Sequence, residues 1–294
     1  MNSRRNFGLP FIRDMPCIDL WRTIRHSYQY ALNNELRLSN QGLSLMLRNL
    51  INVARRIKRH LTDAARRIKR HLIRHPSATS TLAKLFDRRP TVVVQVGSND
   101  GLQGDPIAAL IRTNPDWQVL FIEPLPHLFR RLLANYPHSP NYRFENVAIS
   151  EKNETRLLYY VSDEIKKTRE DVPYWYDQLG SFDKTHVLKH GKEFEPFIVS
   201  EAVRCEPLRD ILARNRIRKI DLLHIDTEGY DYQVLKQVDL EISPPRAILY
   251  EHKHLSRKDQ SAARRLLSRV GYRVRPDDGG DTLAILREAM KPSR

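Results

Sequence analysis

The chain has 294 residues, of which 40% are hydrophobic, so it is long and apolar enough to form a sizeable core. No stretch reaches the roughly 18 consecutive apolar residues that a membrane-spanning helix needs, and the N-terminus lacks the apolar run of a secretory signal. We therefore expect a cytoplasmic protein. Cys17 and Cys205 are the only cysteines and form no CxxC pair, which excludes a structural zinc site built from cysteines.

The formal net charge of +15 is concentrated at one end of the chain. Residues 1–90 hold 19 Lys or Arg against 5 Asp or Glu, a net charge of +14, whereas residues 91–294 hold 31 against 30, a net charge of +1. Because the two regions differ so strongly in charge, we expect a basic helical extension over residues 1–90 and a globular domain over residues 91–294.

An amphipathic helix is predicted in the extension over about residues 47–74, because apolar residues recur there every three or four positions. Residues 54–61 (ARRIKRHL) are repeated as residues 65–72. Such a basic helix suits an anionic membrane surface, which would make the protein peripheral at the membrane. Alternatively, its apolar stripe packs on the rest of the chain or on a second copy. Nucleic acid is less favoured, because few aromatic residues lie among the charges. Residues 1–46 have weaker periodicity and are expected to be partly disordered.

The first predicted strand of the domain is the β-branched run over residues 91–96, which is followed at once by a turn with two glycines. Glycine allows unusual backbone angles and the close approach of a ligand. The spacing G-x-x-x-G differs from the G-x-G-x-x-G that binds a pyrophosphate, so the turn suits a cofactor without phosphates. The cofactor-binding residues predicted here are Gly97, Ser98, Asn99, Asp100 and Gly101.

Polar groups also follow the next predicted strands. The strand over residues 118–122 ends in Glu123-Pro124, where a doubly wound fold places a carboxylate that binds ribose hydroxyls. A third strand over about residues 142–149 offers Asn146, Val147 and Ala148 as an edge for an adenine ring. Strands over residues 220–225 and 247–250 end in Asp226-Thr227-Glu228-Gly229 and Glu251-His252. Since open α/β sheets bind ligands at the carboxyl ends of their strands, these tips predict one common site.

These motifs resemble the FkbM family of methyltransferases over roughly 200 residues. The family pattern runs D-[VI]-G-A-N-x-G, then E-P, then K-[IV]-D-x-E-G, and the matching residues here are 95–101, 123–124 and 224–229. Gln95 stands where the family usually has Asp, and His224 where it commonly has Lys. The resemblance implies S-adenosylmethionine as cofactor, with Asp226 as a further cofactor-binding residue, and a small or glycan-like hydroxyl acceptor.

An alcohol acceptor needs a nearby base at neutral pH. The candidates at the strand tips are Asp226, Glu228, Glu251 and His252. The alternative role for Asp226 is to cap the N-terminus of a helix. The alternative role for His252 is a hydrogen bond that is only structural. Methylation of a nucleic-acid base is disfavoured, because the [DNS]-P-P-[YFW] segment typical of such enzymes is replaced by residues 226–229.

The residues that follow these strands could alternatively bind magnesium or manganese, because they offer carboxylates and imidazoles. The candidate ligands are Asp226, Glu228, Glu251, His252 and His254. The family resemblance implies no metal, and we predict none.

A long stretch over residues 162–202 separates the third and fourth strands and is expected to act as a lid. Tyr174, Trp175, Gln178 and Ser181 are its predicted acceptor-binding residues, because aromatic rings with amide and hydroxyl groups suit a sugar or polyketide-like molecule. Ordinary packing is the alternative for the aromatic residues.

Residues 272–275 and 282–286 flank a turn-forming segment and predict a closing hairpin. The predicted fold is therefore α/β: a doubly wound, Rossmann-like class I methyltransferase sheet that ends in an antiparallel hairpin and carries the basic helical extension. The favoured function is S-adenosylmethionine-dependent O-methylation of a saccharide, glycolipid or secondary metabolite. The alternatives are an RNA or other nucleic-acid methyltransferase anchored by the extension, a non-catalytic cofactor-binding module and, disfavoured by the glycine spacing, a nicotinamide enzyme.

Overall fold

The computed structural model describes residues 76–136, 138–173, 175–277 and 279–290. The predicted amphipathic helix over residues 47–74, the rest of residues 1–75, and Tyr174 lie outside the described residues. From Pro76 onward the described residues form one compact unit. No helix among them is long and apolar enough to cross a membrane.

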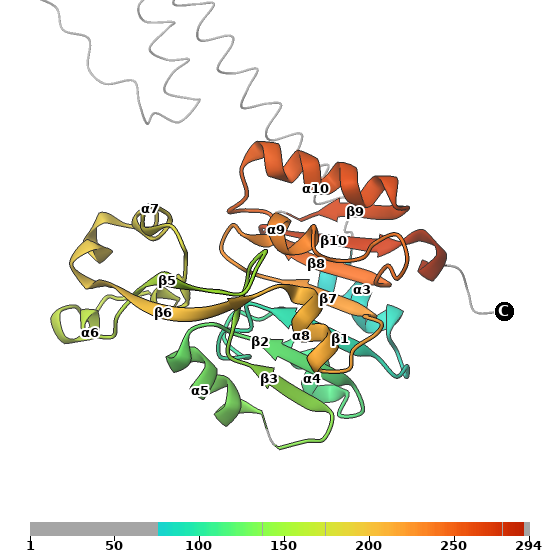
Figure 1. Cartoon of the computed structure of the whole chain (residues 1–294), viewed down its shortest axis with the longest axis horizontal. Helices are drawn as coiled ribbons and strands as arrows, with labels where there is room; N and C mark the ends of the chain where they lie inside the picture. Colours follow the sequence, from blue (N-terminus) through green and yellow to red (C-terminus); the bar gives the residue numbers. More distant parts are fainter. Residues whose placement is uncertain (1–75, 137, 174, 278, 291–294) are drawn as a thin grey trace, which may run out of the picture. The chain divides into compact units, whose positions relative to one another are not determined.

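A seven-stranded sheet forms the centre of this unit, in the order β3-β2-β1-β7-β8-β10-β9 (Figure 1). Strand β10 pairs antiparallel with both of its neighbours, and the other pairings are parallel. The strands are β1 (Val92–Val96), β2 (Gln118–Ile122), β3 (Tyr142–Glu145), β7 (Leu222–Ile225), β8 (Ala247–Glu251), β9 (Tyr272–Pro276) and β10 (Asp281–Leu286). The predicted doubly wound sheet and its closing hairpin are thus confirmed.

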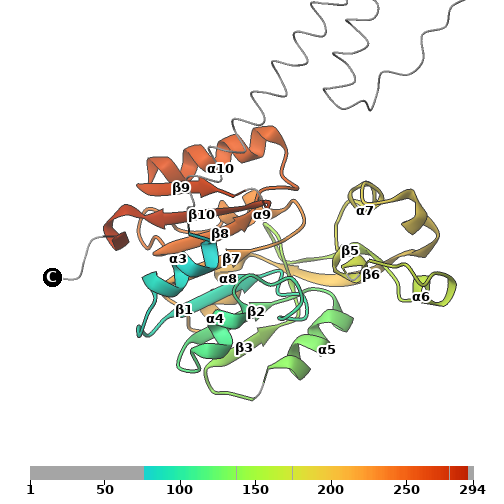
Figure 2. The ribbon, with the colours of Figure 1, turned by 180° about the vertical axis from the view of Figure 1, so that it is seen from behind.

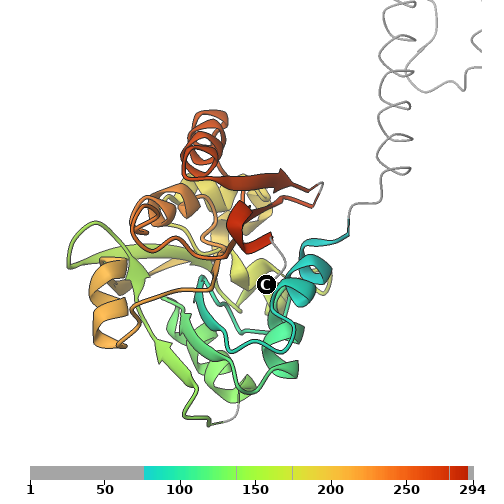
Figure 3. The same ribbon diagram turned by 90° about the vertical axis from the view of Figure 1, so that its right-hand side faces the viewer.

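Helices cover both faces of the sheet. One face packs against α8 (Leu208–Arg214), α9 (Asp231–Leu235) and α10 (Arg257–Arg269). The other packs against α3 (Ala78–Leu85), α4 (Ala108–Thr113) and α5 (Pro126–Asn135). Figure 2 shows α3 and α4 in front of the sheet, and Figure 3 shows them on the opposite side from α8, α9 and α10. Because both faces are buried, the parallel strands are almost continuously apolar.

The domain begins earlier than the predicted boundary at residue 91. Helix α3 places Leu82 in the core, and the following Phe86 packs edge-on against Trp117 with ring centroids 6.0 Å apart. The guanidinium of Arg275 in β9 also donates to the backbone oxygen of Pro76, at 2.9 Å. Residues 76–90, which we assigned to the extension, therefore contribute to the core of the domain.

The predicted third strand is two strands in different sheets. Strand β3 ends at Glu145, and β4 (Ala148–Ile149) pairs instead with β6 (Ile198–Glu206) in a separate sheet of order β4-β6-β5. Strand β5 (Glu154–Val161) pairs antiparallel with β6 along its whole length. This second sheet was not predicted.

The insertion between β5 and β6 carries short helices and a small core of its own. Its helices are α6 (Ile165–Thr168), η1 (Tyr176–Gln178), α7 (Lys184–Leu188) and η2 (Lys192–Phe197), while η3 (Arg287–Met290) ends the described chain. Val161, Tyr176 and Phe194 are buried together within it. Figure 1 shows the insertion projecting beside the strand tips of the main sheet. The stretch predicted to act as a lid is thus a folded element with a small core of its own.

Candidate functional site

A cavity of about 410 Å³ lies where the strand tips of the main sheet meet the insertion. Its walls come from the loops after β1, β2, β7 and β8, from β4 and β5, and from the insertion. Of the predicted site residues, it is lined by Gly97, Asn99, Glu123, Pro124, Val147, Ala148, Gln178, Ser181 and Glu228. Residues predicted from five separate segments of the sequence therefore meet at one cavity.

Gly97 lets the loops after β1 and β7 cross in contact. Its φ is +79°, and a Cβ there would lie 1.7 Å from the backbone oxygen of Asp226. Any side chain at this position would therefore collide with backbone. From the sequence alone, Gly97 is explained by the close approach of a ligand. The group that lies closest to Gly97 is instead the backbone of Asp226, directly after β7.

Ser98 and Asp100 hold the glycine turn from within. The hydroxyl of Ser98 donates to the backbone oxygen of Gln95 and accepts from the backbone N–H of Ile122, at 3.2 and 3.1 Å. Asp100 Oδ1 accepts from the backbone N–H groups of Leu102 and Gln103, at 3.0 and 2.9 Å. Neither side chain lines the large cavity.

Gly101 closes the same turn. It is packed beneath Tyr136, whose hydroxyl donates to the backbone oxygen of Gly101 at 2.9 Å. Like Ser98 and Asp100, Gly101 lies outside the cavity lining and shapes the loop that carries Asn99.

Glu123 places a buried carboxylate at the cavity wall. The side chain accepts from the backbone N–H of Asn99 at 2.9 Å and from that of Leu125 at 2.8 Å. Burial raises its pKa to about 7, although both hydrogen bonds act in the opposite direction. Each carboxylate oxygen keeps acceptor capacity beyond these bonds, so Glu123 is able to receive hydroxyl donors from a ligand in the cavity.

Asn146 acts behind the wall, because its side-chain amide donates to the backbone oxygens of Glu123 and Pro124, at 2.8 and 3.0 Å. Val147 and Ala148 line the cavity itself, together with Ile149 and Leu158. This side of the cavity is therefore an apolar wall beside a carboxylate.

Asp226, Glu228 and Glu251 gather their carboxylates within 4.8 Å of one another. Burial, then the nearby Glu228 charge, raises the pKa of Asp226 well above its ordinary value. Burial, then Asp226, raises that of Glu251 to about 10. Asp226 lines a small separate cavity of about 40 Å³ behind Gly97, so only Glu228 of the three faces the large one.

His252 and Trp175 lie outside the cavity lining. The Nδ1 atom of His252 is 3.0 Å from the hydroxyl of Thr282 in β10. Trp175 packs within the insertion, edge-on to Phe194 with ring centroids 6.2 Å apart. His252 thus makes a hydrogen-bond contact and Trp175 a packing contact. These contacts correspond to the structural alternatives given for the two residues in the sequence analysis.

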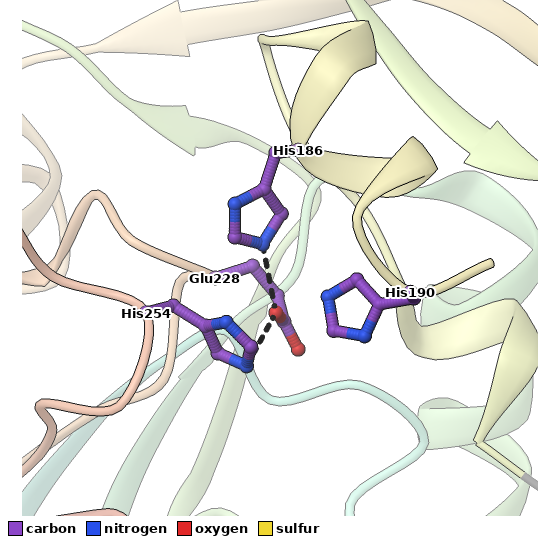
Figure 4. A group of neighbouring side chains, drawn as sticks. All are labelled: His186, His190, Glu228 and His254. Atoms are coloured by element: carbon purple, nitrogen blue, oxygen red, sulfur yellow. Dashed lines mark hydrogen bonds and ion pairs between the residues drawn. The ribbon is translucent and has the colours of Figure 1, made fainter. Parts of the chain in front are cut away.

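Three histidines surround Glu228 (Figure 4). The sequence alone places His254 with Glu228 as a hard-metal alternative but does not add His186 and His190. His186 and His190 come from the insertion and His254 from the loop after β8. The Nε2 atoms of His186 and His254 lie 3.2 and 3.4 Å from Glu228 Oε2. The four-residue spacing of His186 and His190 gave no reliable signal, because helix α7 ends at Leu188 and His190 lies in the turn that follows.

A sequence profile of the Methyltransferase FkbM domain matches residues 95–274, which is more than half of the chain. Comparison with curated proteins finds no match. Similar solved structures include the fibrillarin pre-rRNA processing protein of Methanococcus jannaschii, with 11% identity over 67% of this chain and 67% of that one and a TM-score of 0.36. Another is a TehB-like SAM-dependent methyltransferase of Corynebacterium glutamicum, with 12% identity over 78% of this chain and 97% of that one and a TM-score of 0.33.

Proposed function

The chain belongs to the FkbM methyltransferase family, and from this premise we propose that it transfers the methyl group of S-adenosylmethionine to a hydroxyl group of a saccharide, glycolipid or secondary metabolite. One observation carries the proposal: Glu123 and the glycine turn meet Glu228 across a cavity at the carboxyl ends of the parallel strands. Doubly wound sheets bind their ligands at this edge.

The cavity has the properties that S-adenosylmethionine requires. Its volume of about 410 Å³ falls within the usual range for small-molecule sites. Glu123 would accept from the ribose hydroxyls, while Val147 and Ala148 would contact the adenine ring. Glu228 contributes a carboxylate to the same cavity.

When bound, S-adenosylmethionine supplies a methyl group that is already activated on a sulfonium. The acceptor oxygen attacks the methyl carbon, so a C–O bond forms as the C–S bond breaks, and the hydroxyl gives up its proton. Of the four residues predicted to assist, only Glu228 lines the cavity. We therefore place activation of the hydroxyl at Glu228 and its histidine partners.

The insertion supports a polyhydroxylated acceptor. It contributes Gln178, Ser181 and Asp183 to the cavity, and β5 contributes Arg156. The guanidinium of Arg156 lies 3.8 Å above the ring of Phe182, which also lines the cavity. Polar groups beside an aromatic face suit a sugar, because a sugar ring offers both hydroxyls and an apolar face.

The test is methyl transfer from S-adenosylmethionine with a radioactive methyl group to a panel of glycans, glycolipids, phenolic compounds and RNA. We expect label in a hydroxyl-bearing compound as an ether that survives mild base. Label confined to RNA bases would contradict the proposed acceptor. Binding of S-adenosylmethionine without transfer to any compound would favour a cofactor-binding module.

We also propose that the basic extension holds the enzyme at an anionic membrane surface, which is supported by its net charge of +14 and the repeated segment over residues 54–61 and 65–72. Co-sedimentation with phosphatidylserine vesicles should weaken at least about tenfold when Arg55, Arg56, Lys58 and Arg59 become Gln, because each basic residue contributes about 1 kcal/mol. Replacing the exposed Arg257, Lys258, Arg264 and Arg265 is the matched control. Binding to RNA in place of vesicles would contradict this proposal.

A further inference from the structure

The strongest unexplained feature of the cavity is the cluster of His186, His190, Glu228 and His254, hereafter the histidine cluster. One donor atom from each residue lies within 4.8 Å of the other three. The four residues come from three segments that are distant in sequence: the insertion, the loop after β7 and the loop after β8. Figure 4 shows the three imidazole rings arranged around the Glu228 carboxylate.

Two distances within the histidine cluster match those between neighbouring ligands of one zinc ion. Zinc bonds of about 2.0–2.1 Å place neighbouring ligands of a tetrahedron about 3.4 Å apart. His186 Nε2 and His254 Nε2 lie 3.2 and 3.4 Å from Glu228 Oε2. The ring centroids of His190 and His254 are 5.1 Å apart and those of His186 and His254 are 5.0 Å apart. The rings therefore crowd around a common point.

Hydrogen bonding alone does not account for the histidine cluster. Nε2 of His190 is buried without a hydrogen-bond partner, which costs about 1–3 kcal/mol for a polar atom. Figure 4 shows the His190 ring turned toward Glu228. A third imidazole that faces the same carboxylate, with its nitrogen unpaired, is better explained by a ligand that all four residues share.

The histidine cluster also has the donor types of a zinc site, because imidazole nitrogens and a carboxylate oxygen are common ligands of that ion. Glu251 lies 3.5 Å from His254 Nε2, the same nitrogen that faces Glu228, so a second carboxylate stands beside that donor atom.

We propose that His186, His190, Glu228 and His254 bind one zinc ion at the wall of the cavity. Three nitrogen donors and one carboxylate favour zinc over magnesium, which prefers oxygen ligands. Binding would fasten the insertion to the loops after β7 and β8. The further role of the ion rests on the proposed function: the acceptor hydroxyl would enter as a fifth ligand, and the ion held by Glu228 and the histidines would lower the pKa of that hydroxyl so that its proton passes to water.

The first test measures metal binding by the full chain, stripped with a chelator and titrated with Zn²⁺, and separately with Co²⁺ to record the visible absorption of a four-coordinate ion. We expect one equivalent of either metal. His190→Gln should weaken Zn²⁺ binding about 100-fold or more, because it removes a direct ligand while lying outside the cavity lining. His254→Gln is a second variant, and thermal melting of both in chelator shows that they fold.

The control is His138→Gln, which replaces an exposed histidine outside the histidine cluster and should bind Zn²⁺ like the unaltered chain. Absence of stoichiometric Zn²⁺ binding, or equal binding by His190→Gln, would overturn the proposal, as would preferential binding of Mg²⁺. S-adenosylmethionine binding is measured on the same samples. If the chain binds S-adenosylmethionine but no Zn²⁺, only the proposed zinc site is refuted. If it binds Zn²⁺ but no S-adenosylmethionine, only the proposed function is refuted.

Discussion

The side-chain amide of Gln95 lies 3.0 Å from Nδ1 of His224, across the paired strands β1 and β7. Both side chains are buried, and the same amide donates to Asp105 Oδ2 at 2.8 Å. Gln95 stands where the family usually has Asp, and His224 where it commonly has Lys. These two departures from the family pattern are therefore in contact, with an amide and an imidazole where the family has residues of opposite charge.

A double-mutant cycle tests this coupling. Gln95→Asp alone should lower the free energy of unfolding by about 3–5 kcal/mol, because it buries an unpaired charge beside Asp105. His224→Lys alone should cost a similar amount. The double variant should recover about 1–3 kcal/mol of the summed losses, measured by urea unfolding. Strictly additive losses would show that the two positions are independent.

Gly97→Ala should lower the free energy of unfolding by at least about 4 kcal/mol or prevent folding, because the new Cβ would lie 1.7 Å from the backbone oxygen of Asp226. Gly104→Ala is the matched control. Its φ is also positive, at +77°, but the nearest atom to a Cβ there is 3.7 Å away. We expect it to cost only about 1–2 kcal/mol of backbone strain. Equal losses in the two variants would refute the close-contact explanation.

Asp231→Asn should reduce the pH dependence of stability. Burial raises the pKa of Asp231 to about 7 in the folded protein. The folded state therefore favours the protonated form, and stability present at low pH is lost as the pH rises through about 7. Between pH 5 and 8 in chelator, the variant should lose about 2 kcal/mol less than the unaltered chain. The exposed Asp116→Asn serves as control; if it flattens the profile equally, Asp231 is not the group responsible.

Substitution of His252 and of His254 should have different effects on kcat. His252 contacts Thr282 outside the cavity, whereas His254 lines it. We expect His252→Ala to keep kcat within about threefold while losing about 1 kcal/mol of stability with its hydrogen bond. His254→Ala should lower kcat at least about 100-fold. A loss of turnover in His252→Ala as large as that in His254→Ala would restore His252 as a catalytic candidate.

The parts of the fold that sequence predicted are those with strong local signals. Val92–Val96 and Ala247–Glu251 are buried, apolar strands followed directly by polar tips, so both the strands and their common edge could be inferred. The second sheet could not, because β4 has only two residues and β5 is half exposed, with no clean alternation of burial. Those elements form only when β6 returns from the insertion to pair with both.

Local sequence signals also predicted only part of the candidate site. Glu123 lies directly after β2 and Glu228 three residues after the end of β7, where the fold dictates their position. His186 and His190 reach Glu228 only because the β5–β6 hairpin brings the insertion back over the strand tips, which the spacing of residues along the chain does not encode. Conversely, Ser98, Asp100 and Asn146 are placed beside the site by sequence, but their hydrogen bonds serve the loops.

Calorimetric titration of the full chain with S-adenosylmethionine and S-adenosylhomocysteine tests the central claim most directly. We expect both ligands to bind at one site and Glu123→Gln to weaken both by about 10- to 100-fold, because a charge-assisted hydrogen bond contributes about 1.5–3 kcal/mol. Thermal melting checks that this variant folds, and the exposed Glu241→Gln should bind as the unaltered chain does. Failure of the unaltered chain to bind either ligand, or full affinity in Glu123→Gln, would contradict the assignment of this cavity as the cofactor site.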